Sequence, residues 1–325
     1  MAICLVTGGA GFIGSHLVDA LLQRGNTVRV LDNFSTGDPV NLENAREQAK
    51  VIDGDITDLT TVQAAMQGVE VVFHQAALAS VPRSIADPMA THQACVTGTL
   101  HVLLAAKEAG VRRVVYAASS SAYGASTRLP KCEGDPTLPL SPYAVAKLAG
   151  EQYCAAFSGV YGLETVRLRY FNVFGPRQSP RSQYAAVIPK FIEAMTAGRS
   201  PILHGDGEQS RDFTFVADVV RANLLAAEAP GVSGNVYNIA CGCRTSLLEL
   251  VAHLNALLES DIKPVHDEAR AGDVRHSQAS IDRARADLGY EPATDIVTGL
   301  HHCLEWWRQR HRTSRPGERR SAVIA

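Results

Sequence analysis

Short apolar runs alternate with amphipathic segments along the first half of the chain. Aliphatic residues fill positions 2–6, which predicts a buried strand, and Leu17, Leu21 and Leu22 follow at helical spacing. Further strands are predicted at residues 27–31, 50–52, 69–73, 113–117 and 164–168, and further helices at residues 61–66, 89–109 and 143–161. Strands that alternate with helices indicate a parallel sheet covered by helices on both faces.

This alternation is lost from about residue 171, where proline, glycine and polar residues become more frequent. The loops at residues 175–183 and 205–211 predict a smaller C-terminal region packed against the sheet. We therefore expect one part over residues 1–170, and a second over residues 171–312 from which some segments return to the first. Residues 313–325 are polar and basic, and they predict a disordered tail.

A glycine-rich turn lies between the first strand and the first helix. Gly8 permits a tight turn, Gly11 lets the backbone approach a diphosphate, and Gly14 lets the helix pack closely on the sheet. The free N–H groups of the helix N-terminus then face the anion. The second strand ends at Asp32, whose carboxylate suits ribose hydroxyls and repels a 2′-phosphate. Together these features predict a Rossmann-type, doubly wound α/β fold that binds NAD rather than NADP.

A tyrosine and a lysine stand one helical turn apart further along the chain. Tyr143 and Lys147 share one face of the predicted helix over residues 143–161. The ammonium group favours the phenolate, so it can lower the pKa of the tyrosine from its usual value of about 10. This pair predicts proton transfer beside a hydride carrier.

Composition narrows the class of protein. The chain has 325 residues, of which 46% are hydrophobic, and a net charge of -2, so neither nucleic acid nor an anionic membrane is an expected partner. No apolar run approaches the roughly 20 residues of a membrane span, and the chain opens directly with a strand, so we expect no signal peptide. The seven scattered cysteines predict reduced thiols in the cytoplasm, and no metal site is expected.

Six motifs in order resemble those of the extended short-chain dehydrogenases/reductases in the NAD-dependent epimerase/dehydratase family. They are TGGxGFIG (7–14), GDITD (54–58), HQAA (74–77), SSSAYG (119–124), SPYAVAK (141–147) and RYFNVFGPRQ (169–178). The match runs from about residue 1 to 310 and is most similar to the UDP-N-acetylglucosamine 4-epimerases. The resemblance implies that NAD removes a hydride from C4 of a UDP-sugar and returns it to the other face. Residues 1–170 then bind mainly NAD, and residues 171–312 mainly the UDP-sugar.

The resemblance also implies roles for individual residues. Tyr143 and Lys147 take the catalytic roles, and Ser119, with Ser120 as second choice, relays the proton. The cofactor residues, besides Tyr143 and Lys147, are Gly8, Gly11, Phe12, Ile13, Gly14, Asp32, Asn33, Asp55, Ile56, Ala76 and Ala77. The substrate residues are Ser80, Ser119, Tyr143, Asn172, Ala186, Val187, Arg211, Arg270, Asp273 and Ser277.

Two positions depart from the family pattern. Cys95 stands where many relatives have asparagine, and Ala79 stands where close relatives have glycine. A hydrogen bond near the cofactor is lost or replaced at the first, and the added methyl group narrows the sugar pocket at the second.

Alternative functions stay open at this point. UDP-glucose and UDP-glucuronate 4-epimerases are the nearest alternatives. Dehydratases and decarboxylases need carboxylic acids where this chain has Ser120 and Ser121. A non-catalytic NAD-sensing protein is a further class, although it would be marked by loss of Tyr143 or Lys147. Ser277 leaves room for an N-acetyl group, so UDP-N-acetylglucosamine and its galacto epimer are the expected substrates. The helices over residues 89–109 and 143–161 resemble those that pair in family homodimers.

Overall fold

The chain is built around a parallel β-sheet, in a computed structural model that describes residues 1–180, 186–268 and 274–312. The strands are β1 (Ile3–Thr7), β2 (Thr27–Asp32), β3 (Lys50–Asp53), β4 (Val71–His74), β5 (Arg113–Ser119), β6 (Glu164–Tyr170), β7 (Val173–Phe174), β8 (Ile202–His204), β9 (Ser210–Arg211), β10 (Thr214–Phe215), β11 (Asn235–Ile239), β12 (Thr245–Ser246) and β13 (Val265–Asp267).

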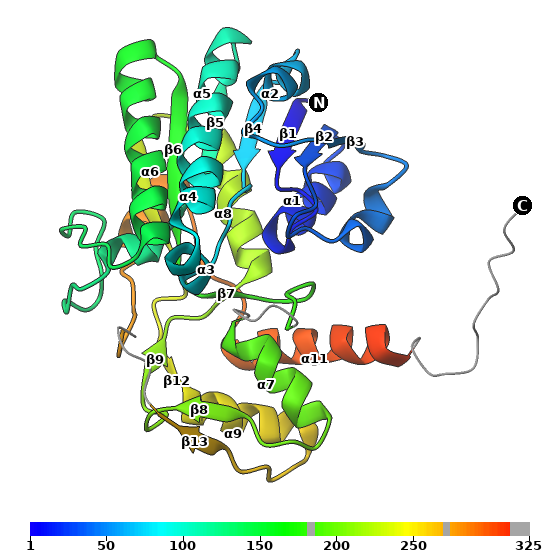
Figure 1. Ribbon diagram of the computed structural model, residues 1–325, viewed down its shortest axis with the longest axis vertical. Helices are drawn as coiled ribbons and strands as arrows, with labels where there is room; N and C mark the ends of the chain where they lie inside the picture. Colours follow the sequence, from blue (N-terminus) through cyan, green and yellow to red (C-terminus); the bar gives the residue numbers. More distant parts are fainter. Residues whose placement is uncertain (181–185, 269–273, 313–325) are drawn as a thin grey trace, which may run out of the picture.

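The helices follow the strands in regular succession over the first half of the chain (Figure 1). The α-helices are α1 (Phe12–Gln23), α2 (Leu59–Met66), α3 (Val81–Ala86), α4 (Pro88–His92), α5 (Gly98–Glu108), α6 (Pro142–Tyr161), α7 (Val187–Thr196), α8 (Val216–Glu228), α9 (Leu247–Leu258), α10 (Asp282–Leu288) and α11 (Ile296–Arg312). Two 3₁₀ segments, η1 (Pro39–Ala45) and η3 (Ser120–Tyr123), and one π-helical turn, η2 (Gln93–Thr97), complete the described structure.

The central sheet has seven strands in the order β11-β6-β5-β4-β1-β2-β3, and the neighbouring strands run parallel. The chain moves outward from β1 through β2 to β3 and then returns to the other side at β4. Ligands of such sheets bind at the carboxyl ends of the strands where this reversal occurs. The predicted Rossmann-type doubly wound fold is confirmed, and so are the six predicted strands. β11, a seventh strand beside β6, was not predicted from the sequence.

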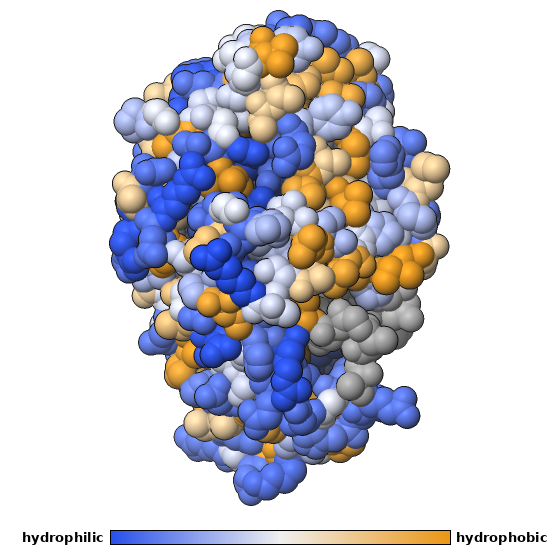
Figure 2. Space-filling model, turned by 90° about the vertical axis from the view of Figure 1, so that its left-hand side faces the viewer, coloured by the Kyte–Doolittle hydropathy of each residue, from blue (hydrophilic) through white to orange (hydrophobic). Residues whose placement is uncertain are grey.

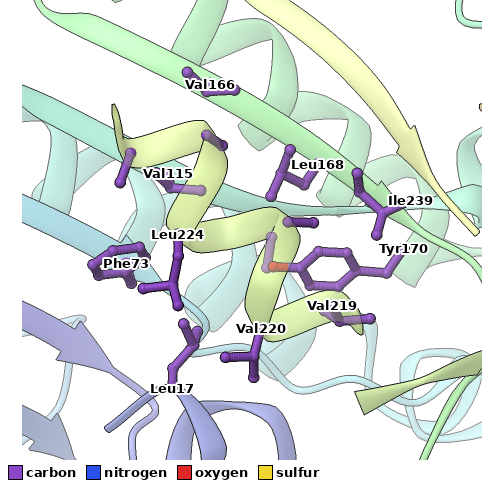
Figure 3. Close-up of a cluster of buried hydrophobic side chains, with 14 of the residues drawn as sticks. Leu17, Phe73, Val115, Val166, Leu168, Tyr170, Val219, Val220, Leu224 and Ile239 are labelled. Atoms are coloured by element: carbon purple, nitrogen blue, oxygen red, sulfur yellow. The ribbon is translucent and has the colours of Figure 1, made fainter. Parts of the chain in front are cut away.

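Helices cover both faces of the sheet, as its alternating side chains require. Val115 of β5 points into a cluster with Leu17 of α1 and Leu224 of α8, whereas its neighbour Val114 points into a second cluster with α2, α5 and α6. Figure 3 shows α8 crossing the first cluster, with Val220 beside Leu17. Because both faces are buried, the strands read as nearly continuous apolar runs.

A smaller region lies below the sheet in Figure 1, where α7, α9 and α11 surround short strands. Phe174, Phe213 and Phe215 anchor its separate apolar cluster. Phe12 and Ile13, from the start of α1, also pack against that cluster. The glycine turn therefore lies between the two cores.

The helix predicted over residues 89–109 is interrupted. α4 and α5 are separated by η2, where the Thr99 hydroxyl donates a hydrogen bond to the Cys95 carbonyl oxygen at 2.8 Å. Such π-helical turns arise where a side chain disturbs the regular ladder of hydrogen bonds, and no apolar pattern marks them.

No helix among the described residues is long and apolar enough to cross a membrane. The predicted disordered tail, residues 313–325, lies outside the described residues.

A buried histidine fixes the carboxyl end of β4 to its neighbours. His74 Nδ1 lies 2.7 Å from the Thr7 hydroxyl, and its Nε2 lies 3.0 Å from the Thr99 hydroxyl. The Thr99 hydroxyl already donates to Cys95, so Nε2 carries the proton and Nδ1 accepts from Thr7. Burial lowers the pKa of His74 from 6.5 to about 3, and the charge of Lys147 adds to this effect.

This pKa predicts how stability depends on pH. Below about pH 6.5 the unfolded chain binds a proton at His74 that the folded chain binds only near pH 3, so the free energy of unfolding falls as the pH falls through this window. The loss reaches about 1.4 kcal/mol per pH unit. We expect His74→Asn to be less stable than wild type near neutrality and to lose less stability between about pH 6.5 and 5. Urea titrations at several pH values measure both slopes, and parallel slopes would refute the assignment.

Candidate active site

A cavity of about 1560 Å³ opens at the carboxyl ends of the central strands. Sites for drug-sized ligands usually span about 300–1000 Å³, so this one has room for more than a single small molecule. It is lined by the ends of β1, β2, β4, β5 and β6, by the start of α6, and by the last turns of α11.

The glycine turn forms one wall of this cavity. Gly8 has a φ of +69°, and a Cβ there would lie 2.7 Å from the backbone of Ala76. A Cβ on Gly14 would lie 2.1 Å from the carbonyl oxygen of Gly8. Glycine is therefore required at both positions, while Gly11 precedes α1 without a side-chain cap. The exposed N–H groups at the start of α1 are left for an anion, so the turn fits a dinucleotide diphosphate.

Asp32 forms the adjoining wall. Its Oδ2 accepts a hydrogen bond from Ala10 N and its Oδ1 accepts one from Phe34 N, both at 2.8 Å. Burial raises the pKa of Asp32, while these hydrogen bonds oppose the rise. A carboxylate held in this orientation suits a ribose diol. Asn33 donates to Asp55 at 2.6 Å across the same wall, which connects the ends of β2 and β3.

The catalytic pair lies at the start of α6. Ser141 caps this helix by accepting from Ala144 N, and Pro142 occupies its first position, so the helix begins one residue before Tyr143. Tyr143 and Lys147 both line the cavity. The spacing prediction that they share one face is confirmed.

The hydroxyl of Ser119 is oriented by its neighbour. Its Oγ accepts two hydrogen bonds from Ser121, one from the hydroxyl at 2.8 Å and one from the backbone N–H at 3.2 Å. Both lone pairs are then used, so the Ser119 proton is directed to its remaining partner, the Tyr143 hydroxyl. Ser120 also lines the cavity.

Burial has the largest effect on the pKa of Tyr143. Burial raises the pKa of Tyr143 and the nearby Cys95 adds to the rise, whereas the hydrogen bond from Ser119 lowers it. The Lys147 ammonium lies 4.4 Å from the centroid of the Tyr116 ring, where it makes a cation–π contact. Burial also lowers the pKa of Lys147. The hydrogen bond from Ser119 is thus a contact that favours the phenolate of Tyr143.

The two departures from the family pattern have different surroundings. Cys95 is 1% exposed and lies within η2, behind the cavity. Ala79 lines the cavity itself, next to Ser80, which caps α3 by accepting from Arg83 N.

Most of the residues singled out in the sequence line this one cavity. These are Gly8, Gly11, Phe12, Ile13, Gly14, Asp32, Asn33, Asp55, Ile56, Ala76, Ala77, Ser80, Ser119, Ser120, Tyr143, Lys147, Asn172 and Ala186. Val187, Arg211 and Ser277 do not belong to its described lining. Arg270 and Asp273 lie outside the described residues.

Arg211 and Ser277 form a separate group beside the cavity. Ser277 N donates to Ser210 O at 3.0 Å, and the Arg211 guanidinium donates to the carbonyl oxygens of Ser210 and Arg275. The backbone between them is held by Asp212, whose carboxylate accepts from the N–H groups of Cys241, Gly242 and Ala279.

Sequence reasoning missed a set of cavity residues far apart in the chain. Arg177 belongs to the RYFNVFGPRQ motif, so the motif signalled its region but not its role. Trp306, Trp307, Arg310 and His311 of α11 also line the cavity. No local pattern signalled these four, because helix α11 reaches the site only through the packing of the second region.

Comparison with known proteins identifies the family. Residues 4–240 match the family model of the NAD dependent epimerase/dehydratase family. The chain belongs to this family. NAD is therefore its cofactor, in agreement with the cavity geometry.

Individual relatives cover nearly the whole chain. A putative UDP-glucose 4-epimerase from Methanocaldococcus jannaschii is 38% identical over 95% of this chain and 99% of its own. The solved UDP-N-acetylglucosamine 4-epimerase from Methanobrevibacter ruminantium M1, in complex with UDP-N-acetylmuramic acid, is 40% identical with a TM-score of 0.91, over 95% of this chain and 99% of its own. The solved UDP-glucose 4-epimerase from Thermotoga maritima, with UDP-glucose, is 38% identical with a TM-score of 0.91 and the same coverage.

The wall formed by Asp32 predicts cofactor preference. We expect wild type to prefer NAD to NADP, and Asp32→Ala to weaken NAD binding by about 1–3 kcal/mol through loss of a hydrogen bond to a charged group. Asp53, the neighbour of Asp32 on β3, lies outside the described cavity lining, so Asp53→Ala is a matched control. Calorimetric titration of cofactor-stripped protein measures both, and equal affinity of wild type for NAD and NADP would contradict the prediction.

Proposed function

We propose that this enzyme, an NAD-dependent UDP-sugar 4-epimerase like its relatives, interconverts UDP-N-acetylglucosamine and UDP-N-acetylgalactosamine. The observation that carries the reaction type is the oriented Ser119–Tyr143 contact inside the cofactor cavity. Two points support the proposal of this sugar. One is the small residue Ser277, and the other is the similarity to the M. ruminantium protein, which is named a UDP-N-acetylglucosamine 4-epimerase.

The chain's own groups supply the proton transfer. In this relay the O4–H group of the bound sugar takes the place of the Ser121 hydroxyl as a donor to Ser119. The O4–H bond then breaks, its proton passes to the Ser119 oxygen, and the Ser119 proton passes to the Tyr143 phenolate. The glycine turn and Asp32 would hold NAD⁺, which would supply a hydride acceptor for C4, a hydride donor to the opposite face of the sugar, and a positive charge in the cavity. Tyr143 returns its proton through Ser119 in the second half of the reaction, so protons and electrons balance over one cycle.

Other reactions of the family need acid groups that this chain does not carry at the corresponding positions. Elimination and decarboxylation require a further acid or base, and Ser120 and Ser121 carry hydroxyl groups in those places. The Ser121 hydroxyl donates to Ser119 before the sugar binds. These contacts favour simple epimerisation.

The proposal of an acetylated substrate at Ser277 rests on the resemblance to related 4-epimerases, in which this position lies against the hexose, since Ser277 lies outside the described cavity lining. Ser277 is a small residue beside Ser210, on the segment that follows residues 269–273. A small side chain leaves volume for the N-acetyl group at C2, whereas a tyrosine would occupy it. UDP-glucose remains the second candidate, because the M. jannaschii and T. maritima relatives carry that name.

We also propose that the enzyme is a homodimer in the cytoplasm. Figure 2 shows apolar side chains along the upper half of the face on which α6 lies. Met89 of α4 and Val145, Tyr153 and Val160 of α6 are large, apolar and exposed. Pairing with a second copy would cover them, and light scattering of the purified protein measures the mass directly.

The Ser119 contact predicts a shift of the pH profile. Tyr143→Phe should lower kcat by about 10²- to 10⁴-fold, because the general base is lost. In Ser119→Ala the pKa of Tyr143 should rise, since the hydrogen bond that lowers it is removed. Activity requires the phenolate, so the rising limb of kcat/KM should move to higher pH. Ser120→Ala is the control and should keep the wild-type profile. An unchanged profile in Ser119→Ala would assign the relay to another group.

The substrate proposal predicts a selective loss. Ser277→Tyr should reduce kcat/KM for the acetylated pair through overpacking worth about 1–3 kcal/mol, and should spare UDP-glucose. Ser277→Ala keeps the space and should leave both reactions unchanged. NMR of products from each sugar gives the rates, and an equal loss on both sugars would show that Ser277 does not select the substrate.

A further inference from the structure

Tyr116 of β5 packs against the helix that carries the catalytic pair. Its side chain is 0% exposed and points into the apolar cluster that β5 shares with α2, α5 and α6. Tyr116 lies outside the described lining of the cavity, so any effect on the reaction has to pass through a neighbour. Its ring and its hydroxyl group both contact Lys147, which does line the cavity.

The ring of Tyr116 contacts the charged end of Lys147. The ammonium nitrogen lies 4.4 Å from the ring centroid, inside the limit of roughly 6 Å for a cation–π contact. Such contacts are strongest where water is excluded, and Lys147 is only 3% exposed. Burial raises the pKa of Tyr116 well above its usual value, so the ring stays a neutral phenol. The attraction is therefore that of a neutral ring face for a cation.

The hydroxyl group of Tyr116 contacts the backbone of the same lysine. It donates a hydrogen bond to the Lys147 carbonyl oxygen at 3.2 Å. A Cβ on Gly150 would lie 2.3 Å from the Tyr116 hydroxyl oxygen, so a side chain there would displace the phenol. Glycine at this position thus lets the phenol reach the backbone of α6. One buried side chain therefore holds both the backbone and the ammonium group of Lys147.

No carboxylate among the described residues forms an ion pair with the Lys147 ammonium. Glu151 follows Lys147 by one turn of α6, and its charge raises the pKa of Lys147. Its two carboxylate oxygens, however, accept hydrogen bonds from Arg169 at 2.6 and 2.9 Å. Both members of this pair are almost completely buried. The carboxylate nearest along the helix is thus already paired with another cation.

The other titratable groups around Lys147 are neutral near neutral pH. His74 of β4 has a pKa of about 3. Burial raises the pKa of the Cys95 thiol in η2, and it raises that of Cys154 on α6 to about 12. Burial lowers the pKa of Lys147 itself. The ring of Tyr116 is thus a direct contact that favours the ammonium form over the neutral amine.

We propose that Tyr116 is a positioning residue for the epimerase reaction, whose ring keeps Lys147 charged and fixed at the cavity wall that Lys147 shares with Tyr143. An ammonium group there favours negative charge in its surroundings, such as the Tyr143 phenolate that the reaction requires. Without the ring, the buried lysine would lose its proton at a lower pH. The inference rests on the proposed catalytic role of Lys147 and not on the identity of the sugar.

The protonation of Lys147 can be followed directly, because the chain contains only six lysines. Protein labelled with ¹³C at the lysine ε carbons is titrated by NMR with its NAD bound, and Lys147→Arg identifies the Lys147 signal. Tyr116→Leu and Tyr116→Met both remove the ring, and we expect each to lower the titration midpoint of Lys147 by about 0.5–1.5 pH units. The ε protons should also lose their ring-current shift. Tyr116→Phe keeps the ring and should retain the wild-type midpoint and ring-current shift.

The pH profile of activity gives a second readout. In the two ring-free variants the falling limb of kcat/KM, measured with the UDP-sugar that wild type converts fastest, should move to lower pH by a similar amount. KM for the sugar should stay near the wild-type value, because Tyr116 lies outside the cavity lining. Tyr116→Phe should restore the wild-type profile. A lowered midpoint of Lys147 with an unchanged falling limb would refute a role of Tyr116 in the reaction.

Tyr237→Leu is the matched control for lost packing. Tyr237 of β11 is also 0% exposed and also makes a cation–π contact, with Arg283, outside the described cavity lining. We expect this change to lower the melting temperature as Tyr116→Leu does, and to leave the midpoint of Lys147 unchanged. A wild-type midpoint in both ring-free variants would refute the proposal, and so would an equal shift in Tyr237→Leu. The NMR titration uses no sugar, so it tests the contact independently of the proposed substrate.

Discussion

The close contact between the glycine turn after β1 and the loop after β4 determines the positions of the other parts of the site. A side chain at Gly8 would meet the backbone of Ala76 at 2.7 Å, so the loops after β1 and β4 are in direct contact. Gly14 extends this contact, since its neighbour is the carbonyl oxygen of Gly8. This packing aims α1 at the reversal point of the sheet and places its N-terminus over the cavity. His74, bonded to Thr7 and Thr99, then fixes α5 in relation to the same two strands.

Burial dominates the chemistry of the site. It raises the pKa of Tyr143 and lowers that of Lys147, so both groups favour their neutral forms in the protein alone. The hydrogen bond from Ser119 lowers the pKa of Tyr143, and the direction of this bond is set by the two donors of Ser121. The serines at the end of β5 therefore influence the protonation of Tyr143. The spacing of Tyr143 and Lys147 places both side chains on the cavity side of α6. NAD⁺ adds its own positive charge to this balance when it is bound.

The sequence predicted those features whose causes are local. Apolar runs marked six strands, and the glycine turn with Asp32 marked the cofactor wall. β11 was missed because its short segment follows a region without regular alternation, and its place beside β6 depends on long-range pairing. The turn η2 was missed because one wider turn inside a helix leaves no mark in the apolar pattern of the sequence. Arg310 was missed because no spacing in the sequence relates α11 to Asp38, which lies 272 residues before Arg310.

The division of labour between the two regions follows from these contacts. The first region supplies rigid backbone to the cavity, namely the glycine turn and the strand ends. The second supplies long side chains, which can separate from their partners without unfolding a strand. Arg177 and Arg310 each form an ion pair with the first region, so side chains of the second region reach the cavity from outside the first apolar core. The site is therefore shared, because rigid backbone of the first region forms one part of the cavity lining and side chains carried by the second region form another.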